Sequence, residues 1–282
     1  MRAWSRGAGR VATQRVPYVV DAALKALGDL RSIVLAGSRP PVSFFAYPGK
    51  PSLQAPAGCV FTRLAGVEED IEGALAALAD LLGARTLAPA HLAHLDPPAL
   101  PSGKLTQEGI AAVLGALMPE NAIVVDESVS TGRGFAALTT HAQPHDWLNL
   151  MGGAIGFALP TSVGAAIACP ERKVITLEGD GSAMYTLQAL WTMARENLDV
   201  TILVFANRTY NILRGELVNV GADAPGQRAT DMLTLDRPAL DWQALARGHG
   251  VESGRANTLD ELATQMRRGL ASSGPYLIEV LL

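Results

Sequence analysis

The sequence predicts an α/β protein, in which a parallel sheet carries helices on both faces and part of a second α/β domain precedes it. Hydrophobic residues make up 49% of the 282 residues and charged residues 18%, the balance of a globular protein with a buried core. With 28 glycines and an aromatic share of only 5%, tightly turned α/β structure is favoured over an aromatic-rich β-sandwich. From residue 105 onward, strands rich in Val, Ile and Leu alternate with helices, as in a parallel sheet.

The chain begins with a basic stretch. Four arginines, from Arg2 to Arg15, precede the first acidic residue, Asp21. A basic start without acids is typical of an organelle transit peptide, but no amphipathic apolar face accompanies these arginines. We therefore expect residues 1–16 to be a flexible surface stretch, or the start of a chain that begins partway through a longer gene product.

Residues 17–87 have the pattern of part of an α/β domain. Apolar spacing predicts a helix over 17–27, a short buried strand over 32–36 and a second helix over 69–82. A loop rich in Pro and Gly, residues 39–58, lies between them. Because these elements are too few to close a sheet, we interpret the region as half a domain.

A proline-studded linker is predicted over residues 88–104. His91 and His94 lie in it at a spacing that suits metal binding. No cluster of carboxylates or thiols accompanies them within the segment, so a metal site there is disfavoured.

Residues 105–282 form the main predicted domain. Its helices are expected over 105–117, 154–168, 187–198, 242–249 and 259–271, and its strands over 122–125, 173–177, 200–205 and 276–281. Thr258 and Glu261 have the spacing of a capping box for the last helix. Ligands of parallel sheets bind at the carboxyl ends of the strands, so functional residues are expected just after Val125, Leu177 and Phe205.

Composition also excludes several classes of protein. With 23 basic and 27 acidic side chains the net charge is −4, so no overall positive field attracts nucleic acid. Two cysteines, Cys59 and Cys169, are too few for a disulfide framework and indicate a reducing, cytoplasmic environment. The longest apolar run, residues 151–169, is broken by glycines and Pro160, so no segment is expected to cross a membrane.

The strongest chemical signal is a pair of polar turns after two neighbouring strands. Gly179-Asp180-Gly181-Ser182 follows the first, and Asn207-Arg208-Thr209-Tyr210 follows the second. Glycines let backbone N–H groups approach an anion, but the carboxylate of Asp180 would repel a phosphate unless a cation lay between them. Mg²⁺ fits, because it takes oxygen ligands from one or two protein groups and from phosphates. An ordinary strand-to-helix turn with a capping Asp is the alternative.

This pair of turns resembles the thiamine diphosphate motif, in which Gly-Asp-Gly is followed, after a spacer, by Asn-Asn at the next strand end. Here the last pair is Ala206-Asn207, and its second position is the metal ligand in the family. The resemblance implies that the side chains of Asp180 and Asn207 and the carbonyl of Thr209 bind Mg²⁺. It also implies that Gly179, Gly181, Ser182 and Tyr210 contact the cofactor.

The resemblance covers about two-thirds of the chain, from the linker to the C-terminus. The sequences of residues 151–160 and 179–213 are similar to those of benzoylformate decarboxylases and acetolactate synthase large subunits. In that family a glycine carbonyl accepts a hydrogen bond from the cofactor's 4′-amino group, which maps to Gly153. An apolar residue that holds the cofactor in its bent form maps to Ile155, and Ser130 matches the segment that reaches the diphosphate. A small-residue helix start that only packs against a neighbour is the alternative.

Two other interpretations are weaker. The run Gly152 to Gly156 has some glycines of a dinucleotide-binding loop, but it lacks the full G-x-G-x-x-G form and the expected acid about 20 residues on. The loop histidines His141, His145 and His249 have no partner pattern that indicates acid–base catalysis. No residue is therefore assigned a catalytic role.

The resemblance also shows departures. Phe44 takes the place of an active-site histidine of benzoylformate decarboxylase, and Leu213 that of an acidic residue of pyruvate decarboxylase. Both disfavour aldehyde release by those enzymes' proton relays and leave carboligation, or decarboxylation with other groups, open. Nothing in the chain corresponds to the family's pyrimidine-binding domain, whose glutamate activates the cofactor.

The resemblance thus implies the C-terminal part of a thiamine-diphosphate- and Mg²⁺-dependent 2-oxoacid carboligase or decarboxylase, acetolactate synthase-like, in the thiamine diphosphate-binding fold after a partial Rossmann-like middle domain. A benzoylformate decarboxylase-like lyase and a catalytically incomplete cofactor-binding chain are the alternatives. The implied partners are a 2-oxoacid substrate and either further copies of the chain, as a homodimer or tetramer, or a separate pyrimidine-domain subunit. True acetolactate synthases bind FAD through the middle domain, so FAD is a further cofactor that the resemblance leaves open.

Overall fold

The computed structural model describes residues 3–222 and 224–282, and the chain divides into two compact units. The larger, unit 1, contains Met1–Ala12, His91–Leu217 and Ala224–Leu282. The smaller, unit 2, contains Thr13–Ala90 and Val218–Asp223. No helix among the described residues is long and apolar enough to span a membrane.

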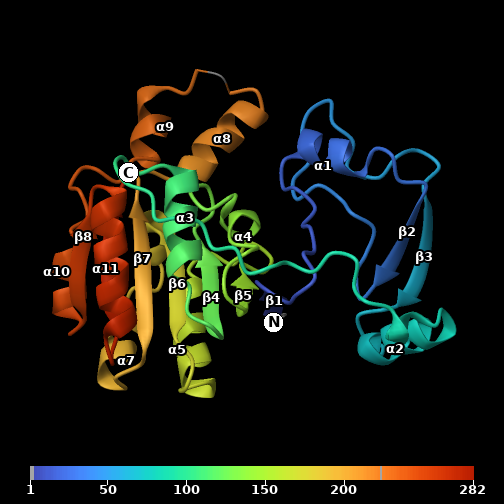
Figure 1. The fold of residues 1–282 in the computed structure, drawn as a ribbon. Helices are drawn as coiled ribbons and strands as arrows, with labels where there is room; N and C mark the ends of the chain where they lie inside the picture. Colours follow the sequence, from blue (N-terminus) through green and yellow to red (C-terminus); the bar gives the residue numbers. More distant parts are fainter. Residues whose placement is uncertain (1–2, 223) are drawn as a thin grey trace. The chain divides into compact units, whose positions relative to one another are not determined.

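Unit 1 is built on a sheet that has seven strands in the described part of the chain (Figure 1). The strands are β1 (Ala3–Arg6), β4 (Ala122–Glu127), β5 (His145–Asn149), β6 (Val174–Gly179), β7 (Val200–Ala206), β8 (Glu252–Ala256) and β9 (Tyr276–Leu281). Their order is β1-β5-β4-β6-β7-β9-β8, and only β1 is antiparallel to its neighbour. The predicted α/β class, with a mostly parallel sheet, is confirmed.

Helices cover both faces of this sheet, because its strands are apolar on both sides. The helices of unit 1 are α3 (Gln107–Leu117), α4 (Phe135–Leu138), α5 (Ala158–Ala168), α6 (Asp180–Ala183), α7 (Ala189–Arg195), α9 (Gln227–Met232), α10 (Trp242–Gly248) and α11 (Leu259–Ala271). In Figure 1, α3 and α11 lie side by side on one face, and their side chains share one core cluster with the sheet. A second cluster joins α5, α7 and α10 to the other face. The remaining helix, α8 (Asn211–Asn219), is divided between the two units after Leu217.

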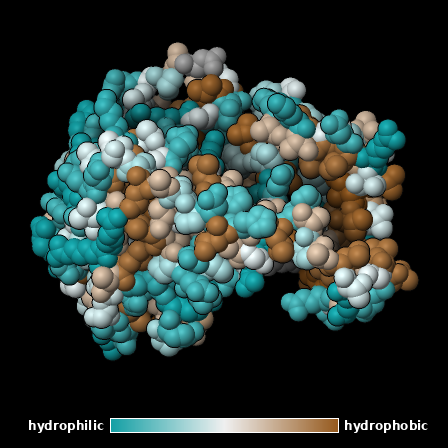
Figure 2. Space-filling model, viewed as in Figure 1, coloured by the Kyte–Doolittle hydropathy of each residue, from teal (hydrophilic) through white to brown (hydrophobic). Residues whose placement is uncertain are grey.

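Unit 2 contains fewer helices and strands than unit 1 in the described residues. It contains α1 (Val20–Leu27), β2 (Ser32–Ala36), β3 (Val60–Ala65), α2 (Ile71–Leu81) and the short 3₁₀ helix η1 (Ala84–Thr86). β2 and β3 form a two-stranded parallel sheet, and α2 has no buried residue. Large apolar side chains such as Val34, Phe44 and Leu81 are exposed, and Figure 2 shows hydrophobic residues gathered over the two strands.

The structure corrects the prediction of a flexible start. Ala3–Arg6 form β1, which pairs antiparallel with β5, and the Arg6 guanidinium donates hydrogen bonds to the carbonyl of Ala136 and the hydroxyl of Thr140. Arg6 is 5% exposed, so an arginine that suggested a solvated tail lies inside the fold. Because the strand partner of β1 and the groups that accept the Arg6 hydrogen bonds lie more than 100 positions away, local composition could not reveal it.

Residues 91–104, expected to lie in a linker, are held against unit 1. Ala93 N–H donates to the carbonyl of Arg10 (2.9 Å), and Leu259 N–H donates to the carbonyl of Gly103 (2.8 Å). The sequence did not predict the strands β1, β3, β5 and β8, and each of them contains adjacent polar or charged residues. Of the predicted caps, Thr258 accepts a hydrogen bond from the N–H of Glu261 (3.2 Å), as expected.

Candidate cofactor site

Asp180 lies where β6 ends and α6 begins, one residue beyond the point at which Gly179 pairs with Phe205 of β7. Its side chain is 2% exposed. One carboxylate oxygen accepts a hydrogen bond from the N–H of Arg208 (2.7 Å), and the other accepts from the N–H of Gly181 (3.0 Å). The two turns picked out in the sequence are therefore hydrogen-bonded to each other.

The buried carboxyl of Asp180 is in an environment that disfavours its charge. Burial raises the pKa of Asp180 to about 6, although the backbone N–H groups of Arg208 and Gly181 act in the opposite direction. Among the described residues, no Lys, Arg or His side chain forms an ion pair with it. A carboxylate held in place by backbone donors, without a cationic side chain, suits a hard divalent cation as its partner.

The turn after β7 has its own internal order. The side-chain oxygen of Asn207 accepts a hydrogen bond from the N–H of Thr209 (3.0 Å), and Arg208 between them has φ +56°. A non-glycine residue rarely adopts this conformation, and such residues concentrate at functional sites. Asn207 thus keeps its amide oxygen in the turn beside Asp180.

A short strap, residues 233–235, fixes this turn from the side. Leu235 N–H donates to the carbonyl of Arg208 (2.7 Å), and Tyr210 N–H donates to the carbonyl of Leu233 (3.0 Å). Thr209 and Thr234 face each other in an isolated antiparallel bridge, and their neighbours make its hydrogen bonds. In such a pair the carbonyl of the middle residue points away from the strap, so the Thr209 carbonyl remains available on the other side.

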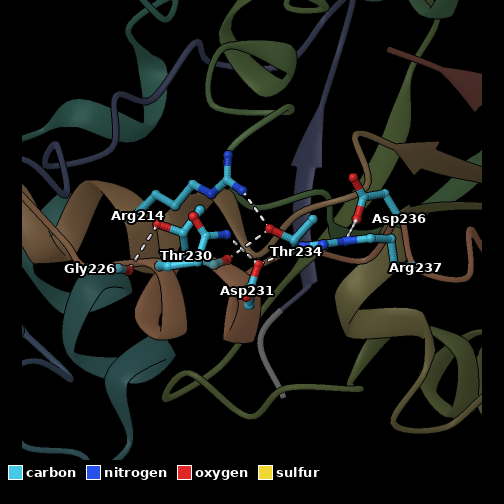
Figure 3. Close-up of polar contacts among 8 residues, drawn as sticks. Arg214, Gly226, Thr230, Asp231, Thr234, Asp236 and Arg237 are labelled. Atoms are coloured by element: carbon cyan, nitrogen blue, oxygen red, sulfur yellow. Dashed lines mark hydrogen bonds and ion pairs between the residues drawn. The ribbon is translucent and has the colours of Figure 1, made fainter.

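The strap is in turn anchored by the polar contacts drawn in Figure 3. Arg214 of α8 donates to the Thr234 hydroxyl (2.9 Å), and that hydroxyl donates to the carbonyl of Thr230 in α9 (2.8 Å). Arg237, just beyond the strap, forms ion pairs with Asp231 (2.5 Å) and Asp236 (3.5 Å). The strap that positions the Thr209 turn is therefore tied to α8 and α9, the two helices that lie between that turn and the strap in the chain.

The other residues predicted near the diphosphate lie around the same turn. The ring of Tyr210 lies against Gly181 at the start of α6. An added Cβ at Gly181 would lie 2.6 Å from this ring, so a larger residue does not fit there unless the ring moves. At Gly179 an added Cβ would meet atoms of the chain only at 3.8 Å. Ser182 is buried at 8% exposure.

A third turn follows β4, the neighbour of β6. Ser130 is half-buried in it, and Val129 before it has φ +44°. A β-branched residue in the left-handed region is strained, so this turn, like the one at Arg208, holds a conformation that its sequence disfavours. Strain at two of the turns at one end of the sheet is consistent with a functional site there.

The segment before α5 contains the remaining predicted residues. Gly152 and Gly153 have φ +62° and +69°, and Ile155 is 46% exposed. Gly156, in contrast, is buried. Ile155, which is predicted to hold the cofactor in its bent form, is therefore an apolar side chain on the surface of this chain, next in sequence to a buried glycine.

Sequence reasoning missed the groups that hold this segment. Glu127 at the end of β4 is 1% exposed; its two carboxylate oxygens accept hydrogen bonds from the N–H groups of Gly156 (2.7 Å) and Ala158 (2.8 Å). The hydroxyl of Thr186 donates to the carbonyl of Gly156 (2.9 Å). A signal was present: α5 begins with no Ser, Thr, Asp or Asn at its start, so its first N–H groups need an acceptor from elsewhere.

Other candidate residues are not brought together. Phe44, in unit 2, is 55% exposed, and Leu213 on α8 is 47% exposed. His141 contacts the carbonyl of His94 through its ring Nδ1 (3.0 Å). The described residues contain no group of three or more His, Cys, Asp or Glu side chains able to hold a metal, so a magnesium site here would need the Asn207 oxygen, a carbonyl and oxygens of the ligand.

Comparison with known proteins agrees with this geometry. Residues 130–280 match the family model described as "Thiamine pyrophosphate enzyme, C-terminal TPP binding domain". The match covers more than half of the chain, includes the turns of Asp180 and Asn207, and begins at Ser130 in the third turn. The chain therefore belongs to the thiamine pyrophosphate enzyme family, through its C-terminal cofactor-binding domain.

Individual relatives place the chain further within this family. It is 50% identical over 279 residues to IlvX of Mycobacterium tuberculosis, provisionally named an acetolactate synthase large subunit, covering 98% of this chain and 53% of the relative. It is 40% identical over 188 residues to benzoylformate decarboxylase of Pseudomonas aeruginosa, covering 65% of this chain and 34% of that enzyme. The chain spans about half the length of IlvX and a third of that of the decarboxylase.

A solved structure is similar over almost the whole chain. The thiamine diphosphate-dependent 4-hydroxybenzoylformate decarboxylase of Rhodococcus jostii RHA1 matches with a TM-score of 0.75 and 27% identity, over 94% of this chain and 51% of that one. The relatives are thus synthases and decarboxylases of one cofactor family, and the chain is a member of a family of enzymes.

Proposed function

We propose that this chain binds thiamine diphosphate through Mg²⁺ and is the cofactor-holding part of a 2-oxoacid carboligase or decarboxylase, acetolactate synthase-like, acting on a pyruvate-type substrate. The observation that carries the proposal is the hydrogen bond from the N–H of Arg208 to the buried carboxylate of Asp180. It joins an anionic oxygen ligand to the turn that holds the Asn207 oxygen and the Thr209 carbonyl.

The chain's own residues have distinct parts in this proposal. Asp180, Asn207 and the Thr209 carbonyl would hold the ion, and Gly179, Gly181 and Ser182 would lie against the diphosphate, with Ser130 and Tyr210 at its sides. Gly153 would accept a hydrogen bond from the aminopyrimidine, and Ile155 would press on it and exclude water. The cofactor itself supplies the electron sink for the carbon chemistry.

Calorimetric titration of the full chain with thiamine diphosphate, with and without Mg²⁺, tests the binding claim. The wild type should bind only when Mg²⁺ is present. Asp180→Ala should weaken binding by at least about tenfold while the fold is retained, because an ion ligand is lost. Asp29→Ala, which removes an exposed carboxylate in unit 2, serves as the control. Unchanged affinity in Asp180→Ala would contradict the ligand assignment.

A benzoylformate decarboxylase-like activity is the second candidate. The 40% identity to the Pseudomonas aeruginosa enzyme and the similarity to the Rhodococcus jostii structure favour it. Phe44 and Leu213, which replace ionisable residues of related decarboxylases, disfavour those enzymes' proton relays and leave carboligation, or decarboxylation with other groups, open. Consumption of pyruvate against that of benzoylformate, measured with and without an added pyrimidine-binding domain, separates the two.

A chain that binds the cofactor without completing catalysis is the third outcome of the same assay. Binding without turnover, even with the added domain, would retain the cofactor claim and remove the enzyme claim. We expect a pyrimidine-binding partner, either a separate subunit or further copies in a dimer or tetramer. We expect a cytoplasmic location, because two cysteines are too few for a disulfide framework.

A further inference from the structure

Helix α5 begins without a capping side chain of its own. Its N-cap residue, Phe157, has helical φ and ψ and makes no side-chain cap. The first N–H groups of a helix have no partner within the helix, and leaving them buried and unpaired costs free energy. Glu127, 30 residues earlier on β4, supplies the acceptor: each of its carboxylate oxygens takes one N–H, from Gly156 and from Ala158. The N-terminus of α5 is thus capped by a side chain of a neighbouring strand.

Gly156 is held on its carbonyl side as well. The Thr186 hydroxyl donates to that carbonyl at 2.9 Å. Gly156 has φ +81°, and an added Cβ would lie 2.9 Å from the side chains of both Tyr185 and Thr186. Gly156 therefore lies in a close-fitting position, with its N–H fixed to β4 and its C=O fixed to the residues after α6.

The five residues before Gly156 have few such contacts. Residues 151–155 are all exposed, and a turn bond from Ala154 N–H to the Met151 carbonyl (3.2 Å) is their internal link. Just before them, Leu150 N–H donates to the carbonyl of Asp126 on β4 (3.2 Å). The exposed segment is thus fixed at both ends, which limits the conformational entropy that it loses when a ligand orders it.

Thr186 comes six residues after Asp180 and is connected to it through a compact turn. Tyr185 and Thr186 donate their N–H groups to the carbonyls of Ser182 and Ala183, within the α6 turn that starts at Asp180. The bond from Thr186 to Gly156 is therefore a direct link between the turn of the expected metal ligand and the segment of Gly153 and Ile155.

We propose that Glu127 and Thr186 are positioning residues that hold Gly156 and so couple the aminopyrimidine-binding segment to the diphosphate-binding turn. The inference rests on the proposed function, because it assigns the two linked segments to opposite ends of the same cofactor. Neither residue touches the cofactor in this scheme. Each acts by fixing the place of Gly156.

We call the hydrogen bonds of Glu127 and Thr186 to Gly156 the clamp. Two isosteric variants each remove the hydrogen bonding on one side of it. Glu127→Gln keeps one acceptor oxygen but turns an amide NH₂ toward the second N–H. Thr186→Val keeps the shape of threonine and removes the hydroxyl, and Thr186→Ser restores it. Glu279→Gln is the control for the first, because Glu279 is a buried glutamate on another strand, β9, and pairs with Arg255 rather than with the start of α5. Thr264→Val, on an exposed position of α11, is the control for the second.

Two readouts are measured on the full chain. Hydrogen exchange of residues 151–158 without ligand reports the clamp, and should become several-fold faster in Glu127→Gln and Thr186→Val but not in the controls. Calorimetry with Mg²⁺ and either thiamine diphosphate or inorganic pyrophosphate reports the coupling. Both variants should weaken thiamine diphosphate binding about tenfold and pyrophosphate binding less than twofold, and Thr186→Ser should restore wild-type affinity for both.

The failures are distinguishable. If the wild type binds thiamine diphosphate and both clamp variants bind it equally well, Glu127 and Thr186 are only structural and the inference is wrong, while the proposed function stands. If pyrophosphate affinity falls as much as thiamine diphosphate affinity, the clamp supports the metal turn and the coupling is refuted. If the wild type binds neither ligand with Mg²⁺, the proposed function fails and this inference with it. Should Glu127→Gln not fold, Thr186→Val and its serine rescue decide alone.

Discussion

The two units are built from the same kinds of element, but they differ in how much apolar surface those elements bury. Both core clusters lie in unit 1, where side chains such as Phe205 and Trp147 are fully buried. In unit 2, α2 buries none of its residues, and Leu81 is 83% exposed (Figure 2). An α/β layer is stable when a helix and a strand each bury one face against another layer, and the described residues of unit 2 supply two strands for this purpose.

The comparison extends to the backbone. Among the described residues, the four non-glycine residues with positive φ are Asn121, Val129, Asn197 and Arg208, and all four lie in unit 1. The positive-φ residues of unit 2 are glycines, such as Gly49 and Gly58, which adopt this conformation without strain. Unit 1 thus has enough buried contact to hold strained turns, and two of these lie at the candidate site.

Matched phenylalanine truncations should give the largest contrast. Phe205→Ala in unit 1 should lower the free energy of unfolding by about 3–5 kcal/mol, because it leaves a cavity in a close-packed core. Phe44→Ala in unit 2, where the ring is 55% exposed, should cost less than about 1 kcal/mol. All four tryptophans lie in unit 1, so urea unfolding followed by tryptophan fluorescence reports that unit alone.

Hydrogen exchange over residues 60–65 reports unit 2 in the same samples. Phe44→Ala should leave the tryptophan transition in place, and Phe205→Ala should move it strongly. Equal losses in the two variants would mean that Phe44 is buried in solution, and the contrast between the units would disappear.

Matched glycine substitutions should give the next largest effect. Gly156→Ala and Gly58→Ala both place a Cβ on a residue with φ near +80°. At Gly58 nothing lies within 4 Å of the new atom, so only the left-handed strain of about 1–2 kcal/mol applies. At Gly156 the Cβ also meets Tyr185 and Thr186 at 2.9 Å, so we expect about 2–4 kcal/mol and a loss of thiamine diphosphate affinity. Thermal unfolding and calorimetry measure these effects, and a stable, fully binding Gly156→Ala would contradict the clamp geometry.

Two glutamates should respond to pH in opposite directions. Burial, together with the nearby carboxyls of Glu127 and Asp126, raises the pKa of Glu178 well above its ordinary value of 4.5. The backbone N–H of Gly66 and the Arg63 guanidinium lower the pKa of Glu69 in unit 2. When the folded-state pKa is raised, stability is lost as the pH rises from the unfolded-state pKa of about 4.5 toward the folded-state pKa. When the folded-state pKa is lowered, stability is lost as the pH falls from about 4.5 through the folded-state pKa.

Glu178→Gln should therefore stabilise unit 1 at pH 7, by about 1–3 kcal/mol, and this gain should vanish as the pH falls toward 4.5. Glu69→Gln should destabilise unit 2 at pH 7 and match the wild type once Glu69 is protonated in both folded and unfolded states. Urea unfolding and hydrogen exchange from pH 4 to 8 check both trends. A pH-independent difference for Glu178→Gln would show that this carboxyl is not buried as described.

The contrast between the units also explains what the sequence could predict. The helix over residues 259–271 and the strand over 276–281 are both found within the predicted bounds, because their apolar periodicity matches their burial in unit 1. The pairing of Asp180 with the turn at Asn207 followed from the rule that parallel strands end at one edge. Their roles as metal ligands, and those of the other predicted cofactor residues, stay predictions.

What could not be predicted depends on distant contacts. β8 (ESGRA) is an edge strand, and β1 contains Arg6, so neither has the apolar run that indicates a strand. Glu127 has an ordinary local sequence, and only the position of α5 beside β4 turns it into a helix cap. The strained φ of Val129 likewise has no local cause in the sequence.

That strain gives the smallest and most specific prediction. Val129→Gly removes a β-branched side chain from φ +44°, so it should stabilise unit 1 by about 0.5–1 kcal/mol after the larger entropy of glycine in the unfolded chain is deducted. Val67→Gly in unit 2, at a 63% exposed position whose φ is not in the left-handed region, should instead destabilise by about 0.5–1 kcal/mol. Urea unfolding gives the first difference and hydrogen exchange the second.

If the strain serves the site, the added stability of Val129→Gly should come with a several-fold loss of affinity for thiamine diphosphate, because Ser130 is no longer held in one place. Calorimetry with Mg²⁺ present measures this loss. A variant that is both more stable and equally tight-binding would mean that the strained turn has no part in cofactor binding, and would leave Ser130 without its assigned role. A Val129→Gly variant that is less stable than the wild type would show instead that the side chain of Val129 contributes more by packing than its backbone conformation costs.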